Sequence, residues 1–168
     1  MQNEPVQTME MFPLEVFKVL LDHEVNKSRR YGDSLTLIDL LIETDPADPG
    51  AQHQAETLAI STLHLHLREV DIPSRRENEF FIMMPCTSMP GARTACERVR
   101  TLMDKEYQTE EGMPFKLITF IGMAGMPNDR SLTGDELARY ASQALQYARL
   151  NQIRNVITYS EIPKQKES

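Results

Sequence analysis

The spacing of apolar residues divides this chain into helical and strand-like segments. From Pro13 to about Arg30, apolar side chains recur every three or four positions, as on one face of a helix. Pro13 suits a first helical turn because its φ is preset and its missing N–H would be unpaired there. The same spacing predicts a helix that follows a loop at 43–52 and ends near Arg68, and further helices over 92–103 and 137–150.

Shorter, continuous apolar runs predict the strands. The run 35–42 is interrupted mainly by Asp39 and suits a strand covered on both faces. Segments 71–76 and 80–84 are candidates for a hairpin with Glu77 and Asn78 in its turn, and two more strands are expected over 115–123 and 156–159. The resulting order predicts an α/β (α+β) fold in which a central mixed sheet of about five strands is flanked by helices.

Composition and charge narrow the class of protein. With 168 residues, 40% hydrophobic and 26% charged, the chain matches one globular domain, expected over 12–160 with tails at 1–11 and 161–168. The net charge of -7 argues against a nucleic-acid partner, and the apolar runs are too short to span a membrane. Two cysteines, Cys86 and Cys96, form no disulfide framework or metal motif, which favours a cytoplasmic location.

Several strings in order resemble the GGDEF family, the diguanylate cyclase domains. They cover about Phe12 to Tyr159, nearly the whole chain, and their joint order and spacing make the resemblance specific. The strings lie at 24–32, 35–39, 67–71, 79–85, 95–100, 121–124, 144–149 and 154–155. The resemblance implies a GGDEF or nucleotidyl-cyclase-like fold in a bacterial signalling protein.

The family signature is altered in this chain. Active members condense two GTP molecules into cyclic di-GMP with metal ions, and their signature places two glycines and a metal-binding acid at the hairpin turn. Here the signature reads Arg76-Glu77-Asn78-Glu79-Phe80, so Arg76 and Glu77 replace the glycines and Asn78 replaces the acid. An amide is a poor Mg²⁺ ligand, and Asp39, which matches the other metal carboxylate, would be a relic. The resemblance therefore implies no catalytic residue, no cofactor and no bound Mg²⁺.

Other nucleotide contacts of the family are also altered. The guanine-recognising Asn after the first strand is missing, and the position of a later guanine-contacting Asp falls near Gln54. Arg149 and Arg154 resemble the phosphate-contacting cations but have a different spacing. These changes favour a domain that does not turn over GTP.

The inhibitory motif of the family, Arg-x-x-Asp, is matched by Arg68-Glu69-Val70-Asp71. The resemblance implies that Arg68 and Asp71, with Arg98 from a neighbouring helix, bind cyclic di-GMP. An Arg fork can donate to guanine or phosphate, and an Asp can accept from guanine N–H groups. The pair could equally be a surface ion pair worth little energy. Four residues separate Asp71 from the signature where five are usual, so Arg75 could supply a contact instead.

Three functions follow as hypotheses. The first is a cyclic di-GMP receptor that signals through a regulatory protein partner or a homodimer. The second is a protein-interaction domain that binds no nucleotide. The third is an enzyme, either a residual cyclase or another nucleotide-handling activity, built on Asp39, Glu77 and Glu79.

Overall fold

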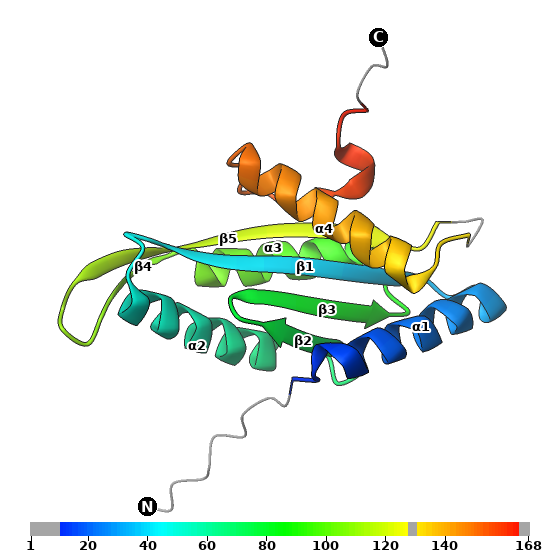
Figure 1. Ribbon diagram of the computed structural model, residues 1–168, viewed down its shortest axis with the longest axis horizontal. Helices are drawn as coiled ribbons and strands as arrows, with labels where there is room; N and C mark the ends of the chain where they lie inside the picture. Colours follow the sequence, from blue (N-terminus) through cyan, green and yellow to red (C-terminus); the bar gives the residue numbers. More distant parts are fainter. Residues whose placement is uncertain (1–10, 128–130, 165–168) are drawn as a thin grey trace, which may run out of the picture.

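One twisted sheet forms the centre of the computed structural model, which describes residues 11–127 and 131–164. Its strands lie in the order β2-β3-β1-β5-β4, and β6 pairs in parallel with β5 (Figure 1). The neighbours along the main path are all antiparallel. The strands are β1 (Leu35–Asp45), β2 (Ile72–Arg76), β3 (Glu79–Pro85), β4 (Glu106–Gln108), β5 (Pro114–Gly125) and β6 (Ile157–Thr158).

In the part of the chain that the structure describes, four helices cover the two faces of this sheet. The helices are α1 (Leu14–Tyr31), α2 (Pro49–His66), α3 (Met89–Met103) and α4 (Gly134–Leu150), and a short 3₁₀ turn η1 (Tyr159–Glu161) follows β6. Apolar side chains of α2 and α3 share one core with the sheet, and those of α1 and α4 share another on the opposite face. The predicted mixed α/β class is confirmed.

β1 is apolar on both sides because both of its faces are covered. Ile38, Leu40 and Ile42 enter the core under α2 and α3, whereas Leu35 and Leu37 enter the core under α1 and α4. Alternation along the strand places Asp39 on the α1 and α4 face. A polar residue is therefore buried in the middle of the sheet.

α4 lies unusually close to β5. A Cβ added to Gly122 would stand 2.1 Å from the backbone nitrogen of Leu145 and 2.5 Å from the carbonyl oxygen of Ala141. Only a residue without a side chain permits this approach. Because Gly122 pairs with Asp39 across the sheet, the close packing also covers that carboxyl.

The predicted elements agree with the structure except in a few details. The hairpin turn at Glu77 and Asn78 is confirmed, and so is the cap of α4, where Thr133 and Glu136 form a capping box. α2 begins at Pro49, earlier than expected, because Asp48 accepts a hydrogen bond from the Ala51 amide at 2.9 Å. The described residues form six strands instead of the expected five, because the three-residue β4 was not predicted. β1 also continues to Asp45.

The ends of the folded part differ slightly from the expected boundaries. Phe12 bridges to Ser74 at the free edge of β2. The sequence pattern assigns Glu161 and Ile162 to the C-terminal tail. In the structure, Glu161 pairs with Arg93, and Ile162 packs against the apolar cluster beside α4. The remaining tail residues 1–10 and 165–168 lie outside the described residues. Among the described helices, none has the length and apolar character needed to cross a membrane.

Candidate functional site

The hairpin between β2 and β3 carries the altered signature. Arg76 and Glu79 are the last paired residues of the two strands, and Glu77 and Asn78 connect them. Glu77 has φ 55°, a left-handed conformation that glycine adopts at little cost. The backbone thus keeps a glycine-type conformation at Glu77, where the resemblance implies the second glycine.

Asn78 serves the structure of the turn. Its side-chain Nδ2 donates to the carbonyl oxygen of Ile42 at 2.8 Å, and the Ile42 amide donates to the Asn78 carbonyl at 3.0 Å. The two contacts tie the hairpin turn to β1. The amide at the implied metal-acid position is therefore engaged with the backbone.

Asp39 and Glu79 lie on the same face of the sheet. Asp39 pairs with Phe81, and Glu79 lies two positions before Phe81 on β3. Asp39 is 1% exposed, and neither of its carboxyl oxygens has a hydrogen-bond donor among the described residues. Burial and the neighbouring Glu79 carboxyl raise the pKa of Asp39 to about 9, against a smaller opposing effect of Arg76. At neutral pH Asp39 is consequently protonated and uncharged.

Arg76 supplies the positive charge of this cluster. Its Nη2 lies 3.1 Å from Oε2 of Glu79, and its guanidinium carbon lies 5.8 Å from the ring centroid of Phe81. Because Phe81 pairs with Asp39, the guanidinium sits on the face that carries both acids. The sequence offered no signal for this arrangement, since it depends on strand register.

These residues do not fit the metal ions that a cyclase of this fold requires. Mg²⁺ prefers several carboxylate or water oxygens in nearly ideal octahedral geometry. Here Asp39 is buried and protonated, Glu79 is paired with Arg76, and Asn78 is tied to Ile42. In the described part of the chain, no group of three or more His, Cys, Asp or Glu side chains could hold a metal ion.

The surface hollow next to the end of β1 is also poorly suited to a triphosphate. It measures about 480 Å³ and is lined by seven residues: Glu43, Thr44, Ala47, Asp48, Pro49, Gln52 and Arg149. Arg149 is paired with Glu43 at 2.5 Å, so its charge is already neutralised. Arg154, the other proposed phosphate contact, pairs with Asp104 at 3.1 Å instead.

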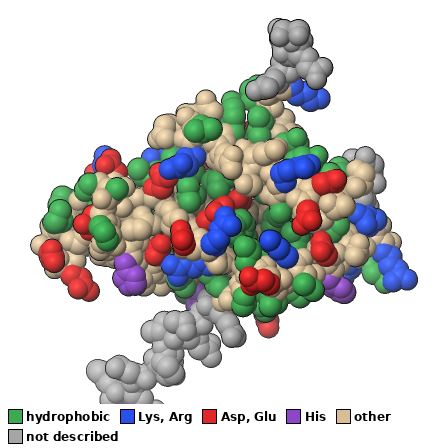
Figure 2. Space-filling model, viewed as in Figure 1, with side chains coloured by type: hydrophobic (Ala, Val, Ile, Leu, Met, Phe, Trp, Pro, Cys, Tyr) green, Lys and Arg blue, Asp and Glu red, His purple; other side chains and the backbone are tan. Residues whose placement is uncertain are grey.

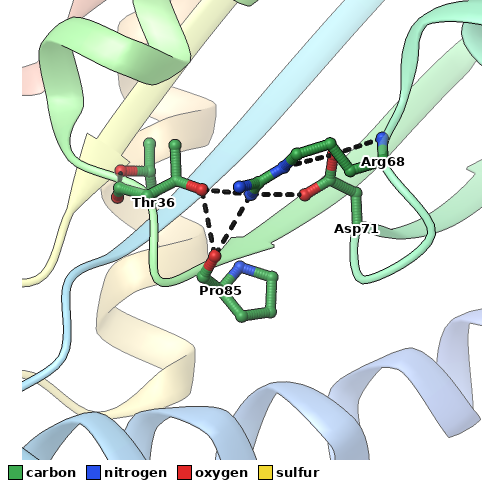
Figure 3. A network of polar contacts seen from close by, with 5 residues as sticks. Thr36, Arg68, Asp71 and Pro85 are labelled. Atoms are coloured by element: carbon green, nitrogen blue, oxygen red, sulfur yellow. Dashed lines mark hydrogen bonds and ion pairs between the residues drawn. The ribbon is translucent and has the colours of Figure 1, made fainter.

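A second polar cluster surrounds Arg68 and Asp71, just before β2 (Figure 3). Asp71 Oδ2 accepts from the Arg68 backbone amide at 2.8 Å and from its Nε at 3.4 Å, and Oδ1 accepts from Nη2 at 2.9 Å. Arg68 Nη2 also donates to the Pro85 carbonyl and to Thr87. The two motif residues are thus brought together, but they bind each other.

The exposure of the two side chains is very different. The Arg68 side chain is 51% exposed, whereas that of Asp71 is 2% exposed. The hydrogen bonds to Asp71 raise the pKa of Arg68 above its ordinary value, which keeps the guanidinium charged. Among the described residues, the polar contacts of the Arg68 side chain use Nε and Nη2, and none of them involves Nη1. The hydrogen bonds to Asp71 hold the Arg68 guanidinium in place.

The remaining predicted site residues lie apart from this pair. Arg98 is exposed on α3, and no polar contact among the described residues links it to Arg68 or Asp71. Arg75 lies at the turn end of β2, where it pairs with Glu56 at 3.0 Å and donates to the Glu77 carbonyl at 2.6 Å. Phe80 of the signature is a fully buried core residue. On the face shown in Figure 2, basic and acidic side chains are intermixed, without an extended basic patch.

No family model and no curated protein matches the sequence, but solved structures match the fold. The GGDEF domain of DgcB from Caulobacter crescentus, in complex with c-di-GMP, has a TM-score of 0.79 and 14% identity, covering 96% of this chain and 97% of that one. The GGDEF domain of YfiN (TpbB) from Pseudomonas aeruginosa has a TM-score of 0.72 and 18% identity, covering 91% and 92%.

A third similar structure is the diguanylate cyclase SiaD from Pseudomonas aeruginosa in complex with its activator SiaC. Its TM-score is 0.74 at 19% identity, with 88% of this chain and 58% of that chain covered. Together the three structures show that this chain has the fold of a GGDEF domain. Function must be argued from the residues of the site.

Proposed function

We propose that this chain is a catalytically inactive GGDEF-type domain that binds cyclic di-GMP through Arg68 and signals to a protein partner. The observation that carries the proposal is the geometry of Arg68. Its side chain is half exposed at the surface and held by Asp71 and the Pro85 carbonyl, and its two Nη1 donors are unused by the residues that the structure describes. A preorganised Arg fork suits the O6 and N7 atoms of guanine or a phosphate oxygen.

The proposed lack of catalysis rests on the hairpin turn and the acids behind it. A residual cyclase would need a metal held by carboxylates close to the turn. Instead, Asn78 binds Ile42, Glu79 binds Arg76, and Asp39 is buried without a charge. The same contacts argue against a different activity built on Asp39, Glu77 and Glu79.

The role of Asp71 differs from the one that the family resemblance implies. Its carboxylate is buried, and both oxygens already accept hydrogen bonds from Arg68. In this arrangement the ligand contacts Arg68, and Asp71 holds the guanidinium in place. Arg98 would join the site only if cyclic di-GMP bridges to α3 or to a second copy of the domain.

The second candidate function is a protein-interaction domain without nucleotide binding. It is favoured by the burial of Asp71 and its hydrogen bonds to Arg68, which leave the motif with one accessible side chain for a ligand rather than two. The complex of SiaD with SiaC provides an example of protein binding among structures of this fold.

Binding to site variants separates the two functions. Calorimetric titration with cyclic di-GMP should show binding by the wild-type chain that Arg68→Ala weakens by at least about tenfold, which corresponds to about 1.4 kcal/mol. Arg139→Ala, which removes an exposed arginine on α4, is the matched control and should bind like wild type. Equal affinity in wild type and Arg68→Ala would reject the assigned site.

A further inference from the structure

A hollow between α2 and the turn that joins β4 to β5 is not used by the proposed ligand site. This hairpin hollow has a volume of about 860 Å³, within the range of about 300–1,000 Å³ that is typical of ligand pockets. Its apolar surface includes Leu58 and Met113, and Met113 is 48% exposed. Its acids are Asp48, Glu110 and Glu111, and none of the described residues that line it is lysine or arginine. The hollow therefore suits an apolar or aromatic side chain accompanied by positive charge.

Hydrogen bonds hold both walls of the hairpin hollow in place. Gln54 Nε2 on α2 donates to the Gln108 carbonyl on β4 at 3.0 Å, which ties the helix to the strand. In the turn, the Gly112 amide donates to the Thr109 carbonyl at 2.9 Å, and the Met113 amide donates to Thr109 Oγ1 at 3.1 Å. A partner therefore meets a turn that is already ordered, which lowers the entropic cost of binding.

Two acids at the edge of the hollow are available to a partner. Glu110 and Glu111 are exposed, and neither forms an ion pair within the described part of the chain. Lys116, on the neighbouring strand β5, pairs with Glu106 at 3.9 Å. The negative charge of the turn is therefore open to a cation from outside the domain.

The opposite end of the molecule has the complementary character. α1 ends at Tyr31, which is 66% exposed, and the Arg30 guanidinium carbon lies 5.7 Å from the centroid of its ring. We call these two residues the α1 tip. Tyrosine and arginine are among the residue types that most often dominate the energy of protein interfaces.

The hairpin hollow and the α1 tip lie at opposite ends of the long axis of the molecule. Figure 1 shows the β4–β5 hairpin at one end and the last turn of α1 at the other. Figure 2, in the same view, shows acidic side chains at the hairpin end and basic side chains at the end of α1. An acidic hollow and a basic, aromatic tip on one chain can bind each other in two different copies.

We propose that a second copy of this chain binds head to tail, with its Tyr31 ring in the hairpin hollow and its Arg30 guanidinium against Glu110 and Glu111. The ring covers Leu58 and Met113 and removes their apolar surface from water. Because the two surfaces differ, the contact is heterologous, and each bound copy leaves one tip and one hollow for the next. The chains therefore associate into open assemblies rather than into closed dimers.

The net charge of the chain does not prevent this contact. Each copy carries a formal charge of -7, so two copies repel each other at long range. At about 0.15 M salt the Debye length is about 8 Å, which screens most of this repulsion, whereas charges in direct contact still attract. The association is therefore best measured at this salt concentration.

Analytical ultracentrifugation of the full chain tests the proposal. The average mass of the wild type should rise with concentration beyond that of a dimer. The hollow variant Glu110→Lys with Glu111→Lys places positive charge against Arg30, and the tip variant Arg30→Ser with Tyr31→Ser removes the inserted group. Each variant alone should associate at least about tenfold more weakly than the wild type.

A matched control separates this contact from a general effect of charge. Glu15→Lys with Glu77→Lys makes the same change in net charge as the hollow variant, at two exposed acids outside both surfaces. This control should associate like the wild type, and circular dichroism checks that every variant is folded. If the double tip variant does not fold, Tyr31→Ser alone replaces it with the same expectation.

Mixing the two variants gives the decisive result. The hollow variant keeps its α1 tip, and the tip variant keeps its hollow, so an equimolar mixture contains one intact pair of surfaces. The mixture should form dimers of one molecule of each variant and no larger species. A wild type that stays monomeric up to about 1 mM, a wild type that stops at a dimer, or a mixture that stays monomeric would overturn the proposal.

Cyclic di-GMP titration separates this inference from the proposed function. α2 has 18 residues and is about 27 Å long, and the hollow lies along its first half whereas Arg68 follows its end. Both variants should therefore bind cyclic di-GMP like the wild type. If the chain associates head to tail while no form of it binds cyclic di-GMP, the association stands and the receptor function fails.

Discussion

Replacing Asp39 with asparagine should stabilise the protein, although Asp39 is a buried polar residue. Asparagine has nearly the same shape, its amide can donate to the Glu79 carboxylate, and unlike Asp39 it takes up no proton on folding at neutral pH. The substitution therefore removes the cost of keeping a carboxyl group inside the sheet. Most substitutions at buried positions have the opposite effect, so the sign of this result is informative.

The magnitude follows from the pKa of Asp39. Burial and Glu79 raise it from 3.8 to about 9, so between these values the native state holds a proton that the unfolded chain releases. The contribution of Asp39 to the free energy of unfolding therefore falls as the pH rises from about 4 to about 9. The ordinary pKa of 3.8 lies about 3 pH units below pH 7. At about 1.4 kcal/mol per unit, Asp39→Asn can raise the free energy of unfolding at pH 7 by at most about 4 kcal/mol.

Urea unfolding at several pH values measures this effect. The difference in unfolding free energy between Asp39→Asn and wild type should be small near pH 4 and should grow to between about 2 and 4 kcal/mol at pH 7. Glu110→Gln removes a charge from an exposed position and should change stability by less than about 0.5 kcal/mol. A difference that does not grow with pH, or a destabilised Asp39→Asn protein at pH 8, would show that Asp39 is not held in its protonated form by the fold.

Three further substitutions test the packing and the turns, each measured by urea unfolding. Gly122→Ala should destabilise the fold by about 3 kcal/mol or more, because the new Cβ would meet the backbone of α4; a loss below about 1 kcal/mol would contradict the close approach. Glu77→Gly should stabilise it by about 1 kcal/mol, since glycine accepts the left-handed φ, and a destabilising effect would argue against that conformation. Thr133→Ala should cost about 1 kcal/mol through loss of the α4 cap, whereas no change would mean that the capping box contributes nothing.

The helices and the long strands could be predicted because their apolar spacing reflects burial directly. β4 could not, because it has three residues, only one of them half-buried, and it exists by pairing with β5. The extension of β1 to Asp45 could not be predicted either, because residues 43–45 are polar. Their composition is typical of a loop and indicated that the strand ends at residue 42.

Within the candidate site, the sequence could predict only a contact between residues that lie close together along the chain. Arg68 and Asp71 are three residues apart, and they do meet. The sequence did not show that they would bind each other, because the burial of Asp71 results from tertiary packing and Arg68 is also held by the distant Pro85 carbonyl. Arg76 contacts Glu79, and its place on the face that carries Asp39 depends on the register of three strands, which no local pattern reveals.

The most direct test of the central claim is a calorimetric titration of the purified chain with cyclic di-GMP, with GTP plus Mg²⁺ titrated in parallel and its products separated by chromatography. We expect saturable binding of cyclic di-GMP and no cyclic di-GMP formed from GTP. Product formation from GTP that disappears in Asp39→Ala would contradict the proposed lack of catalysis, and absence of binding with both nucleotides would contradict the receptor function.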